Sequence, residues 1–452
     1  MRIAESKYHF IGIGGIGMCG LAELLHTLGA KVTGSDPAEN QQVAHLREIG
    51  IQVFTDHQAA HVGDADVVVY SSAIKTGNAE LESAKIKKIP IIARAEALAE
   101  LMRLKRGIAV AGTHGKTTTT SLLASAFIAA QQDPSVVIGG RLQLLGSTAV
   151  WGRGSWMIAE ADESDGSFKK LSPEIVVITN IDNDHLDYYG SFENLEKAFL
   201  DFAEQIPFYG MVFACGDDPN IRRLFAKFSK PIRYYGVSEE NDFQLKEEKG
   251  KYFVLRNGKL ISPISVNLPG VHNLLNASVV MAIAQELRLP LDLVRMGLEN
   301  FSGVDRRAQW KGRRDGVEVF DDYGHHPTEV LATIKGFKEK YSDKRLVVCF
   351  QPHRFSRTRL CWQQFLQAFK GADELWLVDI YAAGEPAESE ISSERLAREI
   401  DHPNCHYYSR AYLTRENLNK HLNTGDVFLT LGAGDCWKIG MEFLSIGTSH
   451  GS

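Results

Sequence analysis

Short apolar runs alternate with segments of helical periodicity along almost the whole chain, and this alternation constrains the fold more than any other feature. It is typical of α/β domains, in which helices connect the strands of parallel sheets. The chain has 452 residues, of which 44% are hydrophobic. That length suits about three domains, and the apolar content is sufficient for several cores. We therefore expect three nucleotide-type α/β modules in series.

The expected strands fall into three blocks, which we assign to domains at residues 1–105, 106–308 and 309–452. Alternation between Asp242 and Leu268, around Asn257-Gly258, predicts an antiparallel hairpin within the second block. Helical sequence resumes from His272 to Leu287. The expected strands are Tyr8–Ile13, Lys31–Thr33, Asp66–Tyr70 and Pro90–Ala93; Gly107–Ala111, Trp156–Ala159, Ile175–Thr179 and Met211–Ala214; and Val317–Phe320, Leu346–Phe350, Glu374–Asp379 and Val427–Leu431.

Charge and cysteine usage narrow the class of protein. The 50 basic and 56 acidic residues give a net charge of −6, which provides no basic field for a nucleic-acid backbone. No run of about 18 apolar residues indicates a membrane span. The uncharged stretch Phe10–Ala22 contains five glycines and no cleavage site follows it, so we interpret it as folded structure. Six cysteines without C-x-x-C spacing favour reduced thiols in a cytoplasmic protein.

The strongest local motif is a phosphate loop between an expected strand and an expected helix over Thr119–Ala130. Glycines allow backbone N–H groups to approach an anion, and the helix N-terminus adds a favourable dipole. Lys116 is expected to hold the β- and γ-phosphates of a nucleotide, and a threonine hydroxyl to reach Mg²⁺. Val110 stands where the general P-loop pattern has its first glycine. The loop residues are Gly112, Thr113, His114, Gly115, Lys116, Thr117 and Thr118.

Two further polar segments follow strands of the same block. Four carboxylates lie within Glu160–Asp165, and their mutual repulsion favours a bound cation over a purely structural role. A solvated acidic loop is the alternative. His185 lies among carboxylates in the segment Asn180–Asp187, at the end of a strand where α/β folds form ligand sites.

A second phosphate-binding motif begins the chain. Gly12, Gly14, Gly15 and Gly17 fit G-x-G-x-x-G between a strand and a helix. Asp36 follows Gly17 by 19 residues, near the spacing of the acidic residue that binds a nicotinamide-cofactor ribose. This motif alone favours an NAD(P)-dependent dehydrogenase, but it suits a UDP-linked ligand equally well. Two phosphate sites and no clear hydride-transfer group favour ATP-driven chemistry on a nucleotide-linked substrate.

Ten ordered motifs together resemble the Mur ligase family of peptidoglycan synthesis, across all three blocks. The resemblance implies an N-terminal Rossmann-like domain for the UDP-sugar, a central P-loop domain for ATP, and a C-terminal Rossmann-like domain for the incoming amino acid. The motifs are FIGIGGIGMCGLAELL, SSAI, GTHGKTTTT, EADESDGSF, NIDNDHLDYYG, PGVHNLLNA, GVDRR, DDYGHHPTEV, QPHRFSRT and LGAGD.

Roles for individual residues are implied by the same resemblance. The metal ion, Mg²⁺ or Mn²⁺, is expected to contact Thr117, Glu160 and His185. Lys116 is expected to contact the phosphates. His272, Asn273, Asn276, Arg307 and Asp322 are expected to contact ATP, and Ser71 and Ser72 to join the glycines and Asp36 in the UDP-sugar site. Arg354 and Arg357 are expected to orient substrate, with His325, His326 and His353 as candidates for accepting the amine proton.

The resemblance is closest to the alanine-adding branch, which joins L-alanine to UDP-N-acetylmuramate with ATP. Other members use a carbamylated lysine about fourteen residues after the equivalent of His185, a position held here by Phe199, with Lys197 two residues away. No carbamate is therefore expected. The nearest alternative is a recycling ligase that attaches a tripeptide to the same UDP-sugar, and Ser164 in EADESD favours the alanine-adding branch over it. A nucleotide-regulated binding protein without turnover is a third possibility. The sequence does not fix the oligomeric state.

Overall fold

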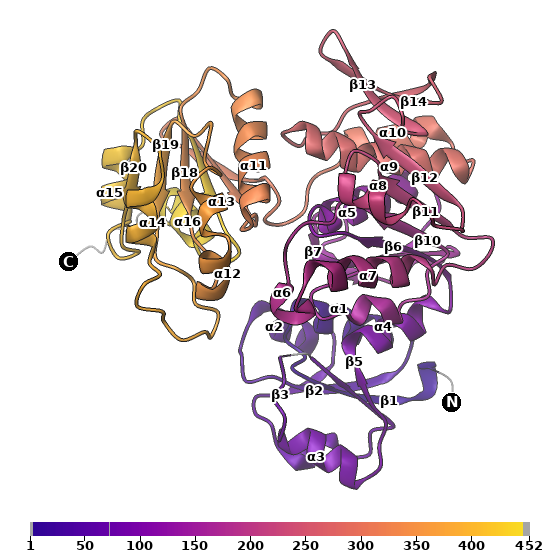
Figure 1. Ribbon diagram of the computed structural model, residues 1–452. Coiled ribbons are helices and arrows are strands. Elements are labelled where there is room, and N and C mark those ends of the chain that lie inside the picture. The colour runs from indigo at the N-terminus through magenta and orange to yellow at the C-terminus, as the bar shows by residue number, and fades with distance from the viewer. Residues whose placement is uncertain (1–2, 72, 446–452) are drawn as a thin grey trace. The chain divides into compact units, whose positions relative to one another are not determined.

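The computed structural model describes residues 3–71 and 73–445. The chain divides into two compact units (Figure 1). The first comprises residues 1–266 and 274–302, and the second comprises 267–273 and 303–452. Within the described residues, the first unit holds two sheets and the second unit holds one.

The N-terminal sheet of the first unit has the strand order β3-β2-β1-β4-β5, with every neighbouring pair parallel. Because the strands run in one direction, the loops after β1, β2 and β5 meet at one edge. This edge carries the glycine-rich loop. The elements are β1 (Lys7–Ile11), α1 (Ile16–Thr27), β2 (Lys31–Ser35), α2 (Gln41–Glu48), β3 (Gln52–Phe54), β4 (Val67–Tyr70), α3 (Ala79–Ile86), β5 (Ile91–Ala93) and α4 (Arg94–Met102), with short 3₁₀ turns at Ile3–Glu5 and Ala59–Val62.

The central sheet has the order β15-β14-β13-β12-β11-β10-β6-β9-β7-β8. Its middle strands β10, β6 and β9 are parallel, so the phosphate loop after β6 lies between the ends of its two neighbours. The elements are β6 (Arg106–Ala111), α5 (Lys116–Ala129), β7 (Ser135–Leu142), β8 (Ser147–Val150), β9 (Trp156–Glu160), a 3₁₀ turn (Ser167–Lys170), β10 (Ile175–Ile178), α6 (Leu186–Tyr189), α7 (Phe192–Ala203), β11 (Met211–Cys215), α8 (Pro219–Leu224), β12 (Ile232–Gly236), β13 (Phe243–Glu248), β14 (Lys251–Arg256), β15 (Lys259–Ile264), α9 (Val271–Glu286) and α10 (Leu291–Glu299).

The sheet of the second unit has the order β16-β17-β21-β18-β19-β20, antiparallel only at β16-β17. Helices cover both faces, and each face has its own apolar core (Figure 1). The elements are β16 (Gln309–Arg314), β17 (Val317–Asp322), α11 (Pro327–Lys340), β18 (Leu346–Phe350), α12 (Phe355–Leu360), α13 (Trp362–Phe365), β19 (Glu374–Leu377), α14 (Ser393–Glu399), β20 (Cys405–Tyr407), α15 (Arg415–His421), β21 (Val427–Leu431) and α16 (Trp437–Leu444).

All twelve expected strands are present, with ends that differ by no more than two residues. The expected hairpin is also confirmed, because β14 and β15 are antiparallel and meet at Asn257 and Gly258, whose φ angles are +48° and +74°. Such positive φ values at both positions suit a type I′ turn. The expected helix at Thr119 begins earlier, at Lys116, because the glycine at position 115 already ends the loop.

The six cysteines are free thiols, and burial raises the pKa of Cys19 to about 12. Among the helices formed by residues 3–71 and 73–445, none is long and apolar enough to cross a membrane.

Candidate functional site

The phosphate loop has a backbone conformation that favours glycine at two positions. Gly112 has a φ of +134°, and a Cβ atom there would lie 2.0 Å from Thr179 Oγ1. Gly115 has a φ of +81° and forms the N-cap of α5. The loop is tied to the end of β10, because Asn180 Oδ1 accepts from the His114 N–H at 2.8 Å and Thr179 Oγ1 donates to the His114 carbonyl at 2.6 Å. The loop is thus rigidly held at the N-terminus of α5, where an anion is favoured.

Lys116 lies over this loop in an ion pair with Glu163. Its Nζ donates to Glu163 Oε1 at 2.8 Å and to the carbonyls of Gly112 and Thr113 at 2.6 and 3.0 Å. Burial lowers the pKa of Lys116, but the carboxylates of Glu163 and Asp162 outweigh burial and raise it overall. Lys116 is therefore a cation, positioned beside the first N–H groups of α5, as phosphate binding requires.

Glu163 is a residue of the acidic segment whose part in the site the sequence did not indicate. Its side chain is fully buried, and burial raises its pKa to about 7 against the opposing charge of Lys116. Its Oε2 atom is buried without a hydrogen-bond partner among the described residues. Since Glu163 lies 47 positions from Lys116 in sequence, only the fold reveals the pair.

Thr117 and Glu160 bring hydroxyl and carboxylate oxygens together beside the loop. Thr117 Oγ1 donates to Glu160 Oε1 at 3.0 Å, and the Gly139 N–H donates to Glu160 Oε2 at 2.8 Å. Hydroxyl and carboxylate oxygens are the donors that a hard divalent cation prefers. With the unpartnered Oε2 of Glu163, this donor set fits a magnesium ion.

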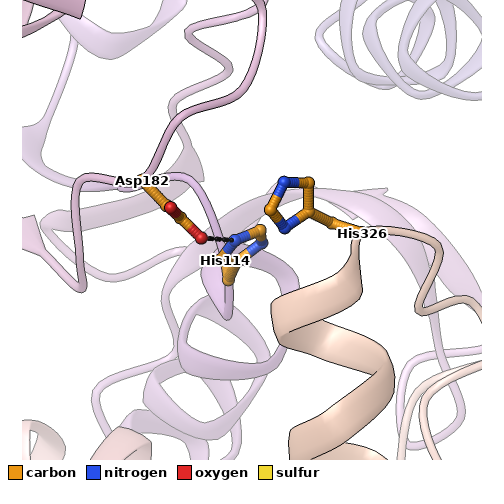
Figure 2. A group of neighbouring side chains, drawn as sticks. All are labelled: His114, Asp182 and His326. Atoms are coloured by element: carbon orange, nitrogen blue, oxygen red, sulfur yellow. Dashed lines mark hydrogen bonds and ion pairs between the residues drawn. The ribbon is translucent and has the colours of Figure 1, made fainter. Parts of the chain in front are cut away.

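His114 and Asp182 form a second polar contact at the loop, and Figure 2 shows the pair. His114 Nε2 lies 3.0 Å from Asp182 Oδ2, and the Asp182 N–H donates to Thr113 Oγ1 at 2.9 Å. His326, also drawn in Figure 2, belongs to the second unit. The contact fixes the orientation of the His114 ring relative to the end of β10.

His185 occupies the turn before α6, in the left-handed conformation with a φ of +58°. Its Nε2 lies 3.6 Å from Glu163 Oε1 and 3.7 Å from Asp184 Oδ2. The Tyr189 hydroxyl donates to the Glu163 carbonyl at 2.5 Å and ties α6 to the acidic segment. The fold therefore brings Lys116, Glu163 and His185 together at the carboxyl ends of the parallel strands.

The glycine-rich loop after β1 is held by the end of β2. The N–H groups of Gly12 and Ile13 both donate to the Ser35 carbonyl, at 2.8 and 3.1 Å. Gly14 donates to Asp36 Oδ2 at 2.8 Å, and Asp36 Oδ1 accepts from the Ala38 N–H at 2.9 Å. Asp36 therefore binds the glycine-rich loop through Oδ2 and its own turn after β2 through Oδ1, contacts that its spacing in the sequence does not indicate.

The two predicted serines lie after β4. The Ser71 N–H donates to the Ile11 carbonyl at 3.1 Å, and a Cβ atom on Gly12 would lie 3.2 Å from the Ser71 Cβ. Ser71 is thus adjacent to the glycine-rich loop. Ser72 lies outside the described residues.

Three predicted nucleotide contacts lie around the start of α9. In the first unit, Asn276 is close to the phosphate loop, because a Cβ atom on Gly115 would lie 3.1 Å from Asn276 Oδ1. His272 and Asn273 belong to the segment 267–273, which groups with the second unit. Asn273 Nδ2 donates to the Pro269 carbonyl at 2.7 Å and closes the turn before the helix.

In the second unit, Arg307 and Asp322 lie at the carboxyl end of β17. Asp322 accepts from the N–H groups of Ala308 and Gly324, both at 2.7 Å. Burial raises the pKa of Asp322 to about 6, although Arg307 and these N–H groups oppose the shift. The Arg307 guanidinium lies 5.2 Å from the centre of the Tyr323 ring. Asp322 thus holds in place the backbone next to Arg307 and next to Tyr323.

The predicted amino-acid residues cluster at the same edge of this sheet. His353 stacks on Tyr381 at a ring distance of 5.6 Å and lies 5.7 Å from the His325 ring. Arg357 Nη1 donates to His353 Nδ1 at 3.4 Å. Burial, reinforced by the charges of His325, Arg357 and Arg354, lowers the pKa of His353 to about 3. His353 is therefore neutral at physiological pH.

Arg354 and His326 have more specific backbone settings. Arg354 has a φ of +67°, and its N–H donates to the Tyr381 carbonyl at 2.8 Å. A positive φ at a residue other than glycine costs about 1–3 kcal/mol and is frequent at ligand sites. His326 is the N-cap of α11, where its Nδ1 accepts from the Thr328 N–H at 3.4 Å. Its capping role accounts for one ring nitrogen.

A phosphate loop with a buried lysine, an adjoining oxygen cluster and a glycine-rich loop in the same unit define a nucleotide-binding α/β protein. Models of three domains match the chain in order: "Mur ligase family, catalytic domain" at residues 7–106, "Mur ligase middle domain" at 110–284 and "Mur ligase, glutamate ligase domain" at 306–434. The chain belongs to the Mur ligase family, whose members are ATP-dependent ligases.

Relatives with curated names match over their full length. A UDP-N-acetylmuramate–L-alanine ligase of Bdellovibrio bacteriovorus is 53% identical over 98% of this chain and 100% of its own. One of Geobacter sulfurreducens is 46% identical over 97% of each chain. The solved UDP-N-acetylmuramate-alanine ligase of Thermotoga maritima is 29% identical, with a TM-score of 0.82 over 97% of this chain and 98% of that chain. The three-domain α/β fold of the family is thus confirmed.

Proposed function

We propose that this enzyme joins L-alanine to the carboxylate of UDP-N-acetylmuramate in the cytoplasm, with ATP as the energy source, in peptidoglycan precursor synthesis. The observation that carries the proposal is the Lys116 ion pair over a phosphate loop, in a chain whose full-length relatives bear this activity in their names. A carboxylate is a poor electrophile, so an amide bond requires its prior activation.

Activation transfers the γ-phosphoryl group of ATP to a carboxylate oxygen, which gives an acyl phosphate and ADP. The ammonium of Lys116 and the N–H groups at the start of α5 stabilise the charge on the transferring group. We assign the loop residues Gly112 to Thr118, with Asn276, His272, Asn273, Arg307 and Asp322, to the nucleotide. Thr117, Glu160 and His185 would hold Mg²⁺ or Mn²⁺, which supplies further neutralisation of phosphate charge when bound.

The second step is attack of the neutral alanine amine on the acyl carbon. The tetrahedral intermediate then expels phosphate, and the amine loses its proton. We assign Arg354 and Arg357 to the anionic oxygens of alanine or of the acyl phosphate, with His325, His326 and His353 around them. Because its pKa is about 3, His353 binds a proton weakly, and we infer that it orients Arg357 rather than acting as the base.

Replacing Arg354 or Arg357 by lysine tests the proposed amino-acid site. Lysine keeps the charge but loses the paired donors of the guanidinium. We expect kcat/KM for alanine to fall, with a loss of transition-state stabilisation of about 1.5–3 kcal/mol, the range for a hydrogen bond to a charged group. ATP affinity should stay unchanged. Arg359→Lys, an exposed position on the same helix, is the matched control. Native kcat/KM in both variants would return the two arginines to a surface role.

Activity is also expected to be independent of added bicarbonate. Phe199 is fully buried on α7, with its ring edge-on to that of Phe168, and Lys197 is exposed on another face of the helix. Because position 199 is a phenylalanine, it cannot carry a carbamate. Steady-state rates in bicarbonate-depleted and supplemented buffer are compared, and short-chain acids should not rescue Phe199→Ala. Stimulation of the native enzyme by bicarbonate would show that another lysine is modified.

The second candidate is a recycling ligase that adds a tripeptide to the same UDP-sugar. A murein peptide ligase of Psychrobacter arcticus shares the fold, with a TM-score of 0.72 at 24% identity. An ADP-release assay distinguishes the candidates: release should require UDP-N-acetylmuramate and L-alanine together, and the tripeptide should not replace alanine. ADP release with UDP-N-acetylmuramate and the tripeptide, in the absence of alanine, would favour the recycling activity. Oxidation or reduction of a nicotinamide cofactor would favour the dehydrogenase alternative.

A further inference from the structure

Arg94 lies between the glycine-rich loop and the acidic segment of the first unit. It is the first residue of α4, directly after β5, at the ligand-binding edge of the N-terminal sheet. A Cβ atom on Gly17 would lie 3.1 Å from Arg94 Nη1 and 3.2 Å from its Cδ. The guanidinium therefore occupies the space that a side chain at position 17 would fill.

The donors of Arg94 are largely unused. Within residues 3–71 and 73–445, the guanidinium has one ionic neighbour, Asp162, at 3.8 Å between Nη2 and Oδ2. That distance is longer than the 2.7–2.9 Å typical of a charge-assisted hydrogen bond. The side chain is 26% exposed, so it is held in place but accessible. An arginine whose five donors make no hydrogen bond to the described part of the chain is suited to an anionic ligand.

The glycine-rich loop by itself offers a diphosphate few donors. The N–H groups of Gly12, Ile13 and Gly14 are already bound to the carbonyl of Ser35 and the carboxylate of Asp36. The remaining donors are the first N–H groups of α1, beginning at Ile16, which have no acceptor within their own helix. Asp36 also places a negative charge beside the loop. A nearby cation would offset this charge, and the Arg94 guanidinium lies against Gly17 on the first turn of α1.

We propose that Arg94 binds the diphosphate of the UDP-sugar, donating from its guanidinium to oxygens held at the N-terminus of α1. This assignment rests on the proposed function, because the UDP-sugar is the substrate that the N-terminal domain would bind. The planar guanidinium offers paired donors that match phosphate geometry. Because Arg94 Nη2 lies 3.8 Å from Asp162 Oδ2, this ion pair is weak. A bound diphosphate therefore competes with only a weak partner for the guanidinium.

Calorimetry on the full-length enzyme tests the assignment, with UDP, UDP-N-acetylmuramate and ATP as separate ligands. Arg94→Met retains much of the side-chain length and removes the charge and donors, and Arg94→Lys retains the charge without the fork. Arg94→Met should weaken binding of UDP and of UDP-N-acetylmuramate by about ten- to a hundredfold, and Arg94→Lys by less. ATP binding should stay native in both. Arg103→Met, at the other end of α4 and paired with Glu100 on the surface, should leave all three affinities native.

Each contrary outcome is distinct. Native UDP affinity in Arg94→Met would overturn the assignment, and so would equal loss of UDP and ATP binding, which indicates a structural role. If Arg94→Met weakens binding of UDP-N-acetylmuramate but not of UDP, Arg94 contacts the carboxylate of the sugar instead. That result would overturn its role at the diphosphate. A wild-type enzyme that binds neither uridine ligand would overturn the proposed function as well. If Arg94→Met does not fold, Arg94→Lys gives the same comparison.

Discussion

Replacement of Lys116 by alanine is expected to lower the rate of ADP formation at least about a thousandfold, while UDP-N-acetylmuramate still binds. Lys116 is the largely buried cation of the phosphate loop after β6, whereas the glycine-rich loop follows β1 in a different sheet. Steady-state ADP release measures the first effect, and calorimetry with the UDP-sugar measures the second. Loss of UDP-sugar binding would contradict the division of the two phosphate sites.

The change also leaves Glu163 buried without its ion-pair partner, which can cost several kcal/mol of stability. A double variant, Lys116→Ala with Glu163→Gln, removes both charges and should recover much of the lost thermal stability without recovering activity. Lys169→Ala, an exposed lysine on a 3₁₀ turn, is the control for removing a positive charge. Activity in the double variant would show that Lys116 is not needed for phosphoryl transfer.

Gly112→Ala is expected to lower both the stability of the protein and its affinity for ATP. The residue has a φ of +134°, and the new Cβ would lie 2.0 Å from Thr179 Oγ1 and 3.0 Å from the Thr179 backbone nitrogen. Backbone strain and steric overlap together should lower the free energy of unfolding by about 3 kcal/mol or more. Because the phosphate loop must shift, ATP affinity should fall at least about a hundredfold. Thermal denaturation and nucleotide calorimetry measure the two effects.

Gly250→Ala separates strain from overlap. Gly250 also has a positive φ, of +75°, but no atom lies within 4 Å of the place that a Cβ would take on this hairpin turn. Its replacement should cost about 1 kcal/mol from the backbone alone and leave ATP affinity native. Equal losses in Gly112→Ala and Gly250→Ala would mean that the contact with Thr179 is not what restricts the loop.

Features that depend on neighbouring residues in sequence could be predicted well. The phosphate loop joins an apolar strand to α5 within a few residues, and Asn257-Gly258 specifies its own turn. The pattern of apolar residues does not predict six of the strands, which are β3, β7, β8, β12, β16 and β20. Several are short or carry charged and glycine residues among the apolar ones, as in Ser135–Leu142, so periodicity alone does not distinguish them from loops.

Contacts between distant residues could not be predicted. The pairing of Lys116 with Glu163 and the position of Arg94 on Gly17 depend on which strands become neighbours. The spacing of Asp36 from the glycine-rich loop predicts a ligand contact, which stays a prediction, but it gives no sign of the hydrogen bond that the carboxylate accepts from the Gly14 N–H. Sequence spacing places an acidic residue at the end of β2 but does not determine which donors its oxygens meet.

Transfer of a heavy-oxygen label from the substrate carboxylate tests the central claim most directly. UDP-N-acetylmuramate labelled in both oxygens of the carboxylate is incubated with ATP, L-alanine and the enzyme, and the released phosphate is analysed by mass spectrometry. If ATP activates this carboxylate and alanine then displaces the phosphate, one labelled oxygen must appear in each phosphate and one must remain in the amide product. Unlabelled phosphate formed together with product would contradict activation through an acyl phosphate.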